Sequence, residues 1–313
     1  MTTDILHTKG THDNWNESFY FNYYDKNNHI CSFMRIGLTP NKESKNMFVF
    51  LLMPNLKLGM RAEAPYKDHT TSTSLKLTIN DLTFEKIQDE DEWNLSYEGP
   101  MIDPHNPQAG PPVFISFKLK FSAAHPIFNY RDCPITKHQE QLSAEVASEH
   151  LEQYGTVKGT LSINDVTFEI NALGERDHSW GIRDWTAPKQ WIWLTGQFRE
   201  KTAFNLTKLT TEHGDIDAGF LHINNTTHPI KSADIHTNYT EAGGPKDFTL
   251  TLTTTDDKTH HIQALMLDHI EVPFTNPKTQ EHSMMYENLA RYTYNNQTGY
   301  GIAEYLIKQD KKK

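Results

Sequence analysis

Short runs in which apolar and polar residues alternate recur along the chain. The clearest runs from Val113 to Phe121, where Ile115, Phe117 and Leu119 alternate with Ser116, Lys118 and Lys120. A period of two residues is typical of a β-strand that buries one face. Ile30 to Leu38 and Met47 to Met53 are further strands, each followed by a Pro-Asn turn. These runs predict antiparallel β-structure.

The same pattern continues to the end of the chain. Strands are predicted in the aromatic stretch 14–25 and at 191–198, 217–223, 248–254 and 260–267, and 284–294 and 300–306 form a predicted hairpin that turns at Asn295-Asn296. One polar segment, Gln139 to Leu151, is rich in Glu, Gln and Ala and predicts a single short helix. The pattern is that of an all-β protein made of sandwiches or barrels.

Two segments of the chain are closely similar. Residues 77–85 (LTINDLTFE) and 161–169 (LSINDVTFE) match at seven of nine positions, with an Asn-Asp pair at the centre of each. Asn and Asp tolerate the positive φ of a tight hairpin turn, so each segment predicts a hairpin. One interpretation is turn chemistry used twice, and the other, which we favour, is two similar domains. We expect an N-terminal β-domain at 1–135, a linker with a short helix at 136–154 and a C-terminal β-domain at 155–313.

Charge and composition exclude several classes of partner. The 313 residues carry 30 Lys and Arg against 40 Asp and Glu, a formal charge of -10, which disfavours nucleic acid and anionic membranes as partners. The two cysteines cannot build a disulfide scaffold. Residues 1–10 contain no apolar signal region, and the apolar run 47–53 is too short to span a membrane. We expect a cytoplasmic protein; the sequence does not indicate an oligomeric state.

Charged and aromatic residues are most concentrated between Gly174 and Trp185. This segment, GERDHSWGIRDW, holds two Arg, two Asp, one His and two Trp. A carboxylate buried beside indole rings must be paired or have a shifted pKa, so the segment is a candidate for catalysis. It is equally a candidate for a structural clamp, because Arg–carboxylate pairs often tie strands together. Arg176 and Asp177 point to opposite faces if the segment is extended.

Other kinds of site have weaker support. The chain has 17 histidines but no H-x-H or H-E-x-x-H pattern, so we predict no metal site. No glycine-rich phosphate loop is present, and we predict no cofactor. Ser179 lacks the G-x-S-x-G context of a serine hydrolase. Glu17, Glu287 and Glu304 lie among aromatic residues, and we interpret each first as a salt-bridge partner.

Three motifs together resemble a known group of proteins. They are Trp15-Asn16-Glu17-Ser18, the segment Arg176 to Trp185 and Tyr300-Gly301-Ile302-Ala303-Glu304-Tyr305. In their order along the chain they resemble a group of uncharacterised bacterial proteins, distantly similar to the carotenoid 1,2-hydratase superfamily with its decalin-forming cyclases. The resemblance implies two lipocalin-like antiparallel β-barrels side by side, with at most one or two short helices. Arg176 and Ser179 depart from the Trp-Asp-His-Glu/Gln-Trp-like signature of those enzymes.

The resemblance also implies an activity. It is a lyase or isomerase reaction, namely proton-initiated hydration, isomerisation or cyclisation of an isoprenoid-like or polyketide-like molecule in an apolar barrel cavity. Asp177 would be the acid if burial keeps it protonated, and aromatic faces would stabilise a cation. The candidate catalytic residues are Asp177, His178, Tyr286 and Glu304, and the candidate substrate-binding residues are Trp180, Arg183, Trp185, Trp191, Trp193 and Tyr305.

Two other functions fit the same residues. The barrels could carry a hydrophobic small molecule without turnover, or the central segment could only lock the domains together. The surroundings of Asp177 discriminate among the three. A carboxyl group that faces an apolar cavity favours the enzyme, whereas a bidentate Arg pair favours the clamp. A pocket lined only by aromatic and methionine side chains favours the carrier.

Overall fold

The protein is built almost entirely of β-strands. The computed structural model describes residues 3–67, 74–108, 110–143, 149–199, 201–276 and 278–309. The strands are β1 (Trp15–Asp25), β2 (Ile30–Thr39), β3 (Ser44–Met53), β4 (Leu56–Pro65), β5 (Lys76–Ile79), β6 (Leu82–Gln88), β7 (Glu92–Met101), β8 (Val113–Ala123), β9 (Phe128–Asn129), β10 (Glu149–Ile163), β11 (Val166–Ile182), β12 (Gln190–Arg199), β13 (Thr202–Thr210), β14 (Asp215–Ile223), β15 (Thr226–Tyr239), β16 (Pro245–Thr254), β17 (Thr259–Thr275), β18 (His282–Tyr294) and β19 (Gln297–Gln309). The described residues add one α-helix, α1 (Lys137–Ser143), and two 3-10 turns, Pro40–Lys42 and Tyr130–Asp132. None of their helices has the length and apolar character needed to cross a membrane.

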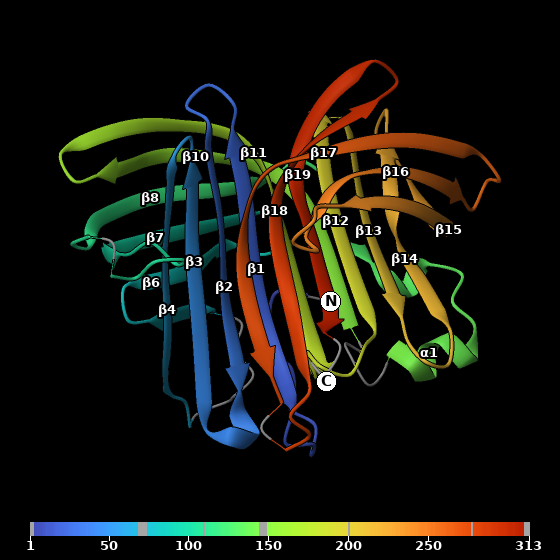
Figure 1. Cartoon of the computed structure of the whole chain (residues 1–313), viewed down its shortest axis with the longest axis horizontal. Helices are drawn as coiled ribbons and strands as arrows, with labels where there is room; N and C mark the ends of the chain where they lie inside the picture. The colour runs from blue at the N-terminus through green and yellow to red at the C-terminus, as the bar shows by residue number, and fades with distance from the viewer. Residues whose placement is uncertain are drawn as a thin grey trace. The chain divides into compact units, whose positions relative to one another are not determined.

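The chain divides into two compact units. The first contains Met1–Ile127 and His150–Ile182, and the second contains Phe128–Glu149 and Arg183–Lys313. In the first unit the strands follow the order β4-β3-β2-β1-β11-β10-β8-β7-β6-β5 in one sheet (Figure 1). A bridge between Gly59 of β4 and Ile102, which follows β7, links the strand at one end of this order to the neighbourhood of a strand near its other end. The sheet therefore curls into a nearly closed barrel.

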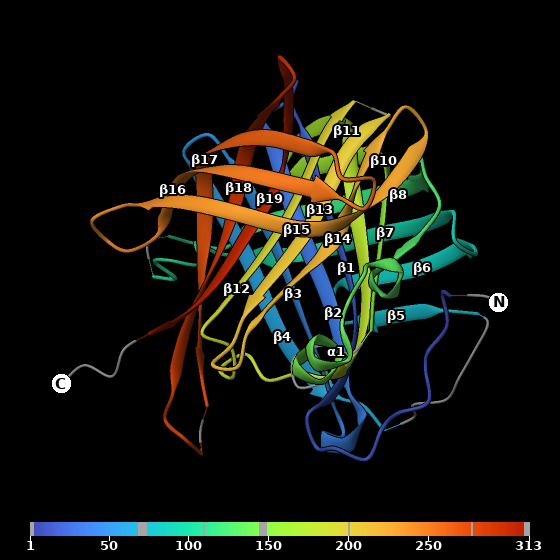
Figure 2. The same ribbon diagram turned by 90° about the vertical axis from the view of Figure 1, so that its right-hand side faces the viewer.

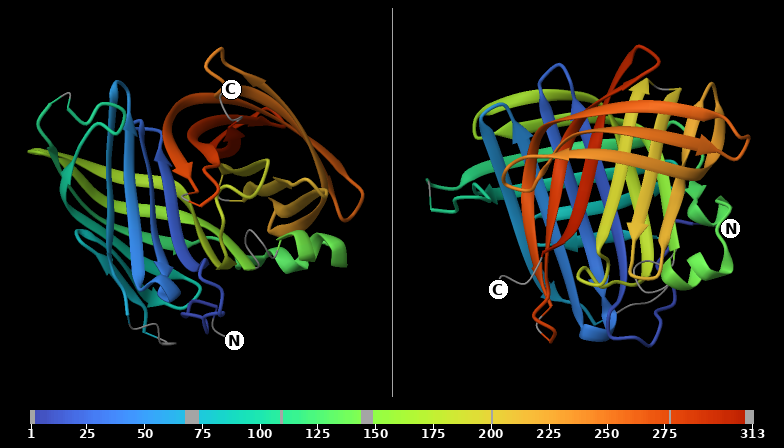
Figure 3. Two further views of the ribbon diagram at one scale, coloured as in Figure 1. Left: turned by 60° about the horizontal axis from the view of Figure 1, so that its bottom comes forward. Right: turned by 45° about the vertical axis from the view of Figure 1, so that its right-hand side comes forward.

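The second unit is a closed antiparallel barrel. Strands β12 to β19 each pair with the next, and β19 pairs back with β12 (Figure 2). Outside this barrel, α1 lies beside β14 (Figure 3), and the Tyr130 hydroxyl donates a hydrogen bond of 2.5 Å to Oδ1 of Asn205 on β13. The prediction of an all-β protein with two antiparallel barrels and at most two short helices is confirmed.

The predicted helix from Gln139 to Leu151 corresponds only in part to α1. Helix α1 covers residues 137–143, and residues 144–148 lie outside the described part of the chain. Leu151 is already in β10, which begins at Glu149. Because the whole segment is polar, our prediction placed the end of the helix too late, within residues that form β10.

The two similar segments form hairpins, but both lie in the first unit. Asn80 and Asn164 have φ of 48° and 50°, as expected for tight turns, and they connect β5 to β6 and β10 to β11. Residues 155–182, which we assigned to the second domain, group with the first unit, because β11 pairs with β1 and β10 with β8. The similarity thus reflects turn chemistry used twice within one sheet.

Each unit has its own hydrophobic core inside its sheet. In the first, Phe19 of β1, Trp93 of β7 and Phe121 of β8 are at most 1% exposed and belong to one cluster. In the second, Phe204 and Tyr305 belong to a separate cluster. The alternation predicted for residues 113–121 is confirmed, since Ile115, Phe117, Leu119 and Phe121 are buried.

Gly196 of β12 lies opposite an aromatic ring, which leaves no space for a side chain at this position. Gly196 pairs with Phe204, and a Cβ atom at residue 196 would lie 2.4 Å from Cε1 of Phe204 and 2.9 Å from Cδ2 of Tyr292. We expect Gly196→Ala to lower the free energy of unfolding by about 1–3 kcal/mol, because overpacking forces these rings out of place. Chemical denaturation measures the change, with Gly110→Ala as control because residue 110 has open space around it. Equal stability of the two variants would contradict this packing.

Candidate functional site

The central segment predicted from sequence lies on β11, and its side chains alternate between two faces. β11 pairs with β1, with Phe19 opposite His178 and Phe21 opposite Arg176. Residues directly opposite each other share a face, so Arg176 and His178 are on the face of the core residues Phe19 and Phe21. Asp177 is on the other face. The prediction that Arg176 and Asp177 point in opposite directions is confirmed.

On the face turned away from the core, Asp177 is part of a cluster with His150 and Glu152. Nε2 of His150 contacts Oδ2 of Asp177 and lies 3.1 Å from Oε1 of Glu152. Ser179 donates a hydrogen bond of 3.2 Å to the other oxygen of Asp177 and lies 3.1 Å from the hydroxyl of Ser18 on β1. All five residues are buried, with Glu152 at 0% exposure. Both carboxylates thus approach one nitrogen of the imidazole, Nε2.

The two carboxylates keep His150 protonated. Burial alone lowers the pKa of the imidazole, but the charges and hydrogen bonds of Asp177 and Glu152 outweigh it and raise the pKa of His150 to about 9. At neutral pH the cluster therefore holds an imidazolium ion. The partner that we considered for Asp177 was a guanidinium group, and the structure provides an imidazolium ion.

This shift predicts a pH dependence of stability. The pKa of His150 is higher in the folded chain, about 9, than the ordinary value of 6.5. The stability that the charged cluster provides is therefore fully present below about pH 6.5 and is lost as the pH rises through 9. We expect the free energy of unfolding to fall over this range by about 3 kcal/mol at most. Denaturation of the wild type and of His150→Gln between pH 6 and 10 measures it; an equal slope for both proteins would contradict the assignment.

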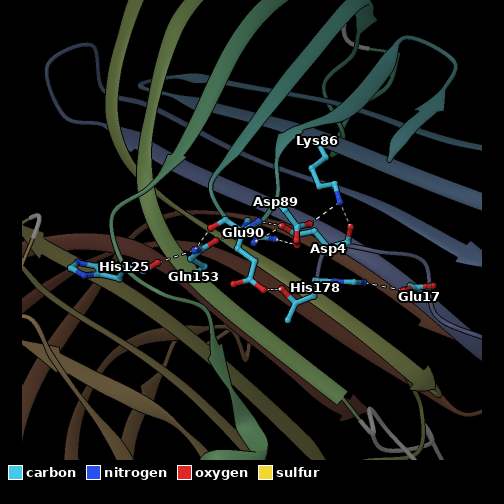
Figure 4. A network of polar contacts seen from close by, with 10 residues as sticks. Asp4, Glu17, Lys86, Asp89, Glu90, His125, Gln153 and His178 are labelled. Atoms are coloured by element: carbon cyan, nitrogen blue, oxygen red, sulfur yellow. Dashed lines mark hydrogen bonds and ion pairs between the residues drawn. The ribbon is translucent and has the colours of Figure 1, made fainter. Parts of the chain in front are cut away.

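On the core face, Arg176 holds the N-terminal segment. Its Nη1 and Nη2 donate to the two oxygens of Asp4 at 2.7 and 3.0 Å, and its Nε donates to Gln153 at 2.7 Å (Figure 4). The backbone N–H of Glu90 and the Lys86 ammonium group also donate to Asp4. Arg176 and Asp4 are 3% and 0% exposed. Arg176 is thus a structural clamp, one of the two roles that the sequence left open for this segment, and its partner is Asp4.

Beside this clamp, Glu17 of β1 binds two histidines. Oε1 of Glu17 lies 2.7 Å from Nδ1 of His7. The same oxygen lies 3.0 Å from Nε2 of His178, a contact marked in Figure 4. Burial alone raises the pKa of Glu17, but hydrogen bonds from His178 and His7 lower it overall. The ring of His7 stacks on Trp180 at 3.6 Å. Glu17 is therefore bound by two imidazoles, and His178 is held within this cluster.

Three predicted substrate-binding residues come together in the second unit. The guanidinium carbon of Arg183 lies 4.9 Å from the ring centroids of both Trp185 and Trp191, and the indole rings are 6.1 Å apart. Phe274 of β17 stacks on Trp185 at 5.2 Å. The cation is attracted by the quadrupoles of both indole rings. The grouping of these three residues follows their closeness in sequence, between the end of β11 and the start of β12.

The other predicted residues of the second unit are divided between the faces of the barrel. Tyr286 and Tyr305 belong to the internal hydrophobic cluster, and the Tyr305 hydroxyl lies 3.0 Å from that of Thr237. Trp193 and Glu304 are opposite each other on β12 and β19, on the face turned away from that cluster. Asp177, His178 and Trp180 lie in the first unit. No single barrel interior therefore contains the whole predicted set.

Sequence reasoning missed His150, Glu152 and His7. The first two lie in the run HLEQY at 150–154, where polar and apolar residues do not alternate regularly, so no strand pattern identified them. This run was assigned to the end of a helix and to the linker. His7 lies in a segment without a periodic pattern, and only its contact with Glu17 identifies it.

Solved structures share this fold across nearly the whole chain. A protein of Nitrosomonas europaea assigned as AttH is 11% identical, with a TM-score of 0.66, covering 95% of this chain and 94% of that one. CghA with Sch210972 is 9% identical, with a TM-score of 0.62 and coverages of 96% and 90%. Kievitone hydratase from Nectria haematococca is 11% identical, with a TM-score of 0.62 and coverages of 94% and 89%. At such identities the likeness shows a shared fold.

The sequence itself points to one family. No curated protein matches the chain. A family model described as a domain of unknown function, DUF7064, matches residues 2–309. Because that match spans both units, the chain belongs to the DUF7064 family.

Proposed function

We propose that the protein is an enzyme that transfers a proton on a hydrophobic small molecule, in a hydration, isomerisation or cyclisation. The observation that carries the proposal is the buried His150, held protonated by Asp177 and Glu152. Buried ionisable groups with shifted pKa values are concentrated at functional sites. The donor in this proposal is His150, and Asp177 orients it.

The chemistry of the cluster limits the reaction. A neutral carboxylic acid in an apolar site can protonate a carbon atom, but Asp177 faces an imidazolium ion that favours its charged form. An imidazolium ion with a pKa of about 9 is a weak acid, suited to oxygen atoms and to carbon atoms conjugated with a carbonyl group. Glu152 contacts the same nitrogen of His150, Nε2, at 3.1 Å and can accept a proton from it in return. We therefore expect an activated double bond in the substrate.

The names of the structural neighbours agree with a small-molecule substrate. One is a hydratase named for kievitone, and another was solved with Sch210972. For this chain, the isoprenoid-like or polyketide-like class and the cytoplasmic location stay predictions. The substrate-binding role also stays a proposal for Arg183, Trp185, Trp191 and Trp193, as does the catalytic role of Tyr286 and Glu304.

Exposure of cell extracts to the protein in heavy water tests the proposal. Apolar small molecules extracted from the source cells are incubated with the wild type and with His150→Gln, and mass spectra are compared. We expect a compound to be converted into an isomer or into its water adduct, with deuterium on carbon, by the wild type only. The control is His236→Gln, because His236 is 77% exposed and pairs with Asp234 at 3.1 Å on the surface.

The same measurement separates an enzyme from a carrier. A carrier would retain an apolar compound through purification without changing its mass or taking up deuterium. If the wild type and His150→Gln both gave that result, we would conclude that the protein is a carrier and not an enzyme. Conversion by His150→Gln at the wild-type rate would remove His150 from the mechanism.

A further inference from the structure

The second cluster of the first unit combines ligand types that metals prefer. Nδ1 of His7, a carboxylate oxygen of Glu17 and Nε2 of His178 lie within 4.8 Å of one another. They come from three different elements, namely the N-terminal segment, β1 and β11. Two imidazoles and one carboxylate are the ligand set of several catalytic zinc sites and of non-haem iron sites. The two histidine nitrogens lie 2.7 and 3.0 Å from a carboxylate oxygen of Glu17. Each of the three groups therefore needs only a small movement to coordinate a common ion.

We infer that His7, Glu17 and His178 bind one divalent first-row transition metal ion, with at least one coordination position left open. This site uses none of the residues of the proposed proton transfer, so it goes beyond that function. Glu17 is 0% and His178 1% exposed, while the His7 side chain is 22% exposed. His7 therefore leaves a path by which an ion can enter from solvent.

The surrounding side chains hold the three ligands in place. The backbone N–H of His7 lies 3.1 Å from both oxygens of Glu17, which orients the carboxylate. The rings of His7 and His178 stack on Trp180 at 3.6 Å and on Phe19 at 4.0 Å. Such outer contacts fix ring orientation in metal sites. Within the described residues, Nδ1 of His178 has no hydrogen-bond partner, so the ring is oriented by its contacts with Glu17, Phe19 and Trp180.

The N-terminal segment is anchored independently of His7. Asp4, three residues earlier, is bound by Arg176, Lys86 and the backbone of Glu90. His7 is therefore positioned before an ion arrives, which reduces the conformational entropy that binding costs. The metal-free chain satisfies Glu17 by hydrogen bonds from both rings, and an ion replaces the protons of these bonds.

Titration of the purified full chain with Zn²⁺ tests the inference. After treatment with a chelator, we expect one Zn²⁺ per chain by calorimetry, and Co²⁺ in its place to show the visible absorption of a low-coordinate site. We expect His7→Ala to weaken this binding at least about 100-fold, since removal of a ligand exceeds the 10- to 100-fold effect of an outer contact. Circular dichroism verifies that the variant is folded.

The second buried cluster provides the matched control. His150, Glu152 and Asp177 also lie close enough to share an ion, so His150→Gln distinguishes the two locations. We expect His150→Gln to keep the stoichiometry and the Co²⁺ spectrum. Loss of binding in His150→Gln, or binding no weaker in His7→Ala, would overturn the inference, as would a wild type without a stoichiometric site. None of these results depends on turnover, so the proposed enzyme function is tested separately.

Discussion

Arg176→Met is expected to lower the free energy of unfolding by about 3–5 kcal/mol, the cost of leaving one member of a buried ion pair without its partner. Asp4 is 0% exposed and receives two hydrogen bonds from Arg176. The variant removes both and leaves the carboxylate buried. Urea denaturation at pH 7 measures the loss.

A pair on the surface serves as the control for this prediction. Lys231 and Asp257 form an ion pair in which their side chains are 53% and 74% exposed. We expect Lys231→Met to change stability by less than about 1 kcal/mol, because exposed pairs contribute little. If Arg176→Met were as mild as Lys231→Met, Arg176 would not be a structural clamp.

Asp177→Asn is expected to reduce turnover by up to about 10²- to 10⁴-fold, the range that a positioned acid–base group provides, because His150 depends on Asp177 for its orientation and charge. Asn keeps the size of the side chain but removes the charge that helps to raise the pKa of His150. In the variant, His150 then loses its proton at a lower pH, and the alkaline limb of the pH–rate profile shifts toward neutral pH. The rate of product formation on the compound found in the extract experiment measures both effects.

The size of the drop separates Asp177 from its hydrogen-bonded neighbour. Ser179 donates one hydrogen bond to Asp177, so we expect Ser179→Ala to reduce turnover less than about 10-fold. If Asp177 had a purely structural role, Asp177→Asn would lower stability without shifting the pH–rate profile. An unchanged profile in Asp177→Asn would therefore count against the proposed role.

The fold could be predicted from sequence because its signals are local. Alternation at residues 113–121 and the Asn-Asp turns at 80–81 and 164–165 depend on neighbours in the chain, and the structure confirms them. The pairing of strands is not local. Nothing near β11 in sequence indicates that it lies beside β1, some 150 residues earlier, so it was assigned to the second domain.

The candidate site likewise has a local part, which was predicted, and a non-local part, which was not. The opposite directions of Arg176 and Asp177 follow from the geometry of one strand and were predicted. Their partners, Asp4 and His150, are 172 and 27 positions away. Asp4 precedes the first strand and meets Arg176 through the fold of the N-terminal segment, whereas His150 meets Asp177 because β10 lies beside β11. For that reason the sequence could identify a buried charged segment but not distinguish a guanidinium clamp from an imidazolium pair.

The most direct test of this account is the charge of His150 in the folded protein. Nitrogen NMR of the ¹⁵N-histidine-labelled chain, assigned with His150→Gln, follows its ring through a titration from pH 5 to 10. We predict that His150 is protonated at pH 7.5, titrates near pH 9 and does so at a lower pH in Asp177→Asn. A neutral ring at pH 7.5 would contradict the proposed donor and the cluster on which the function depends.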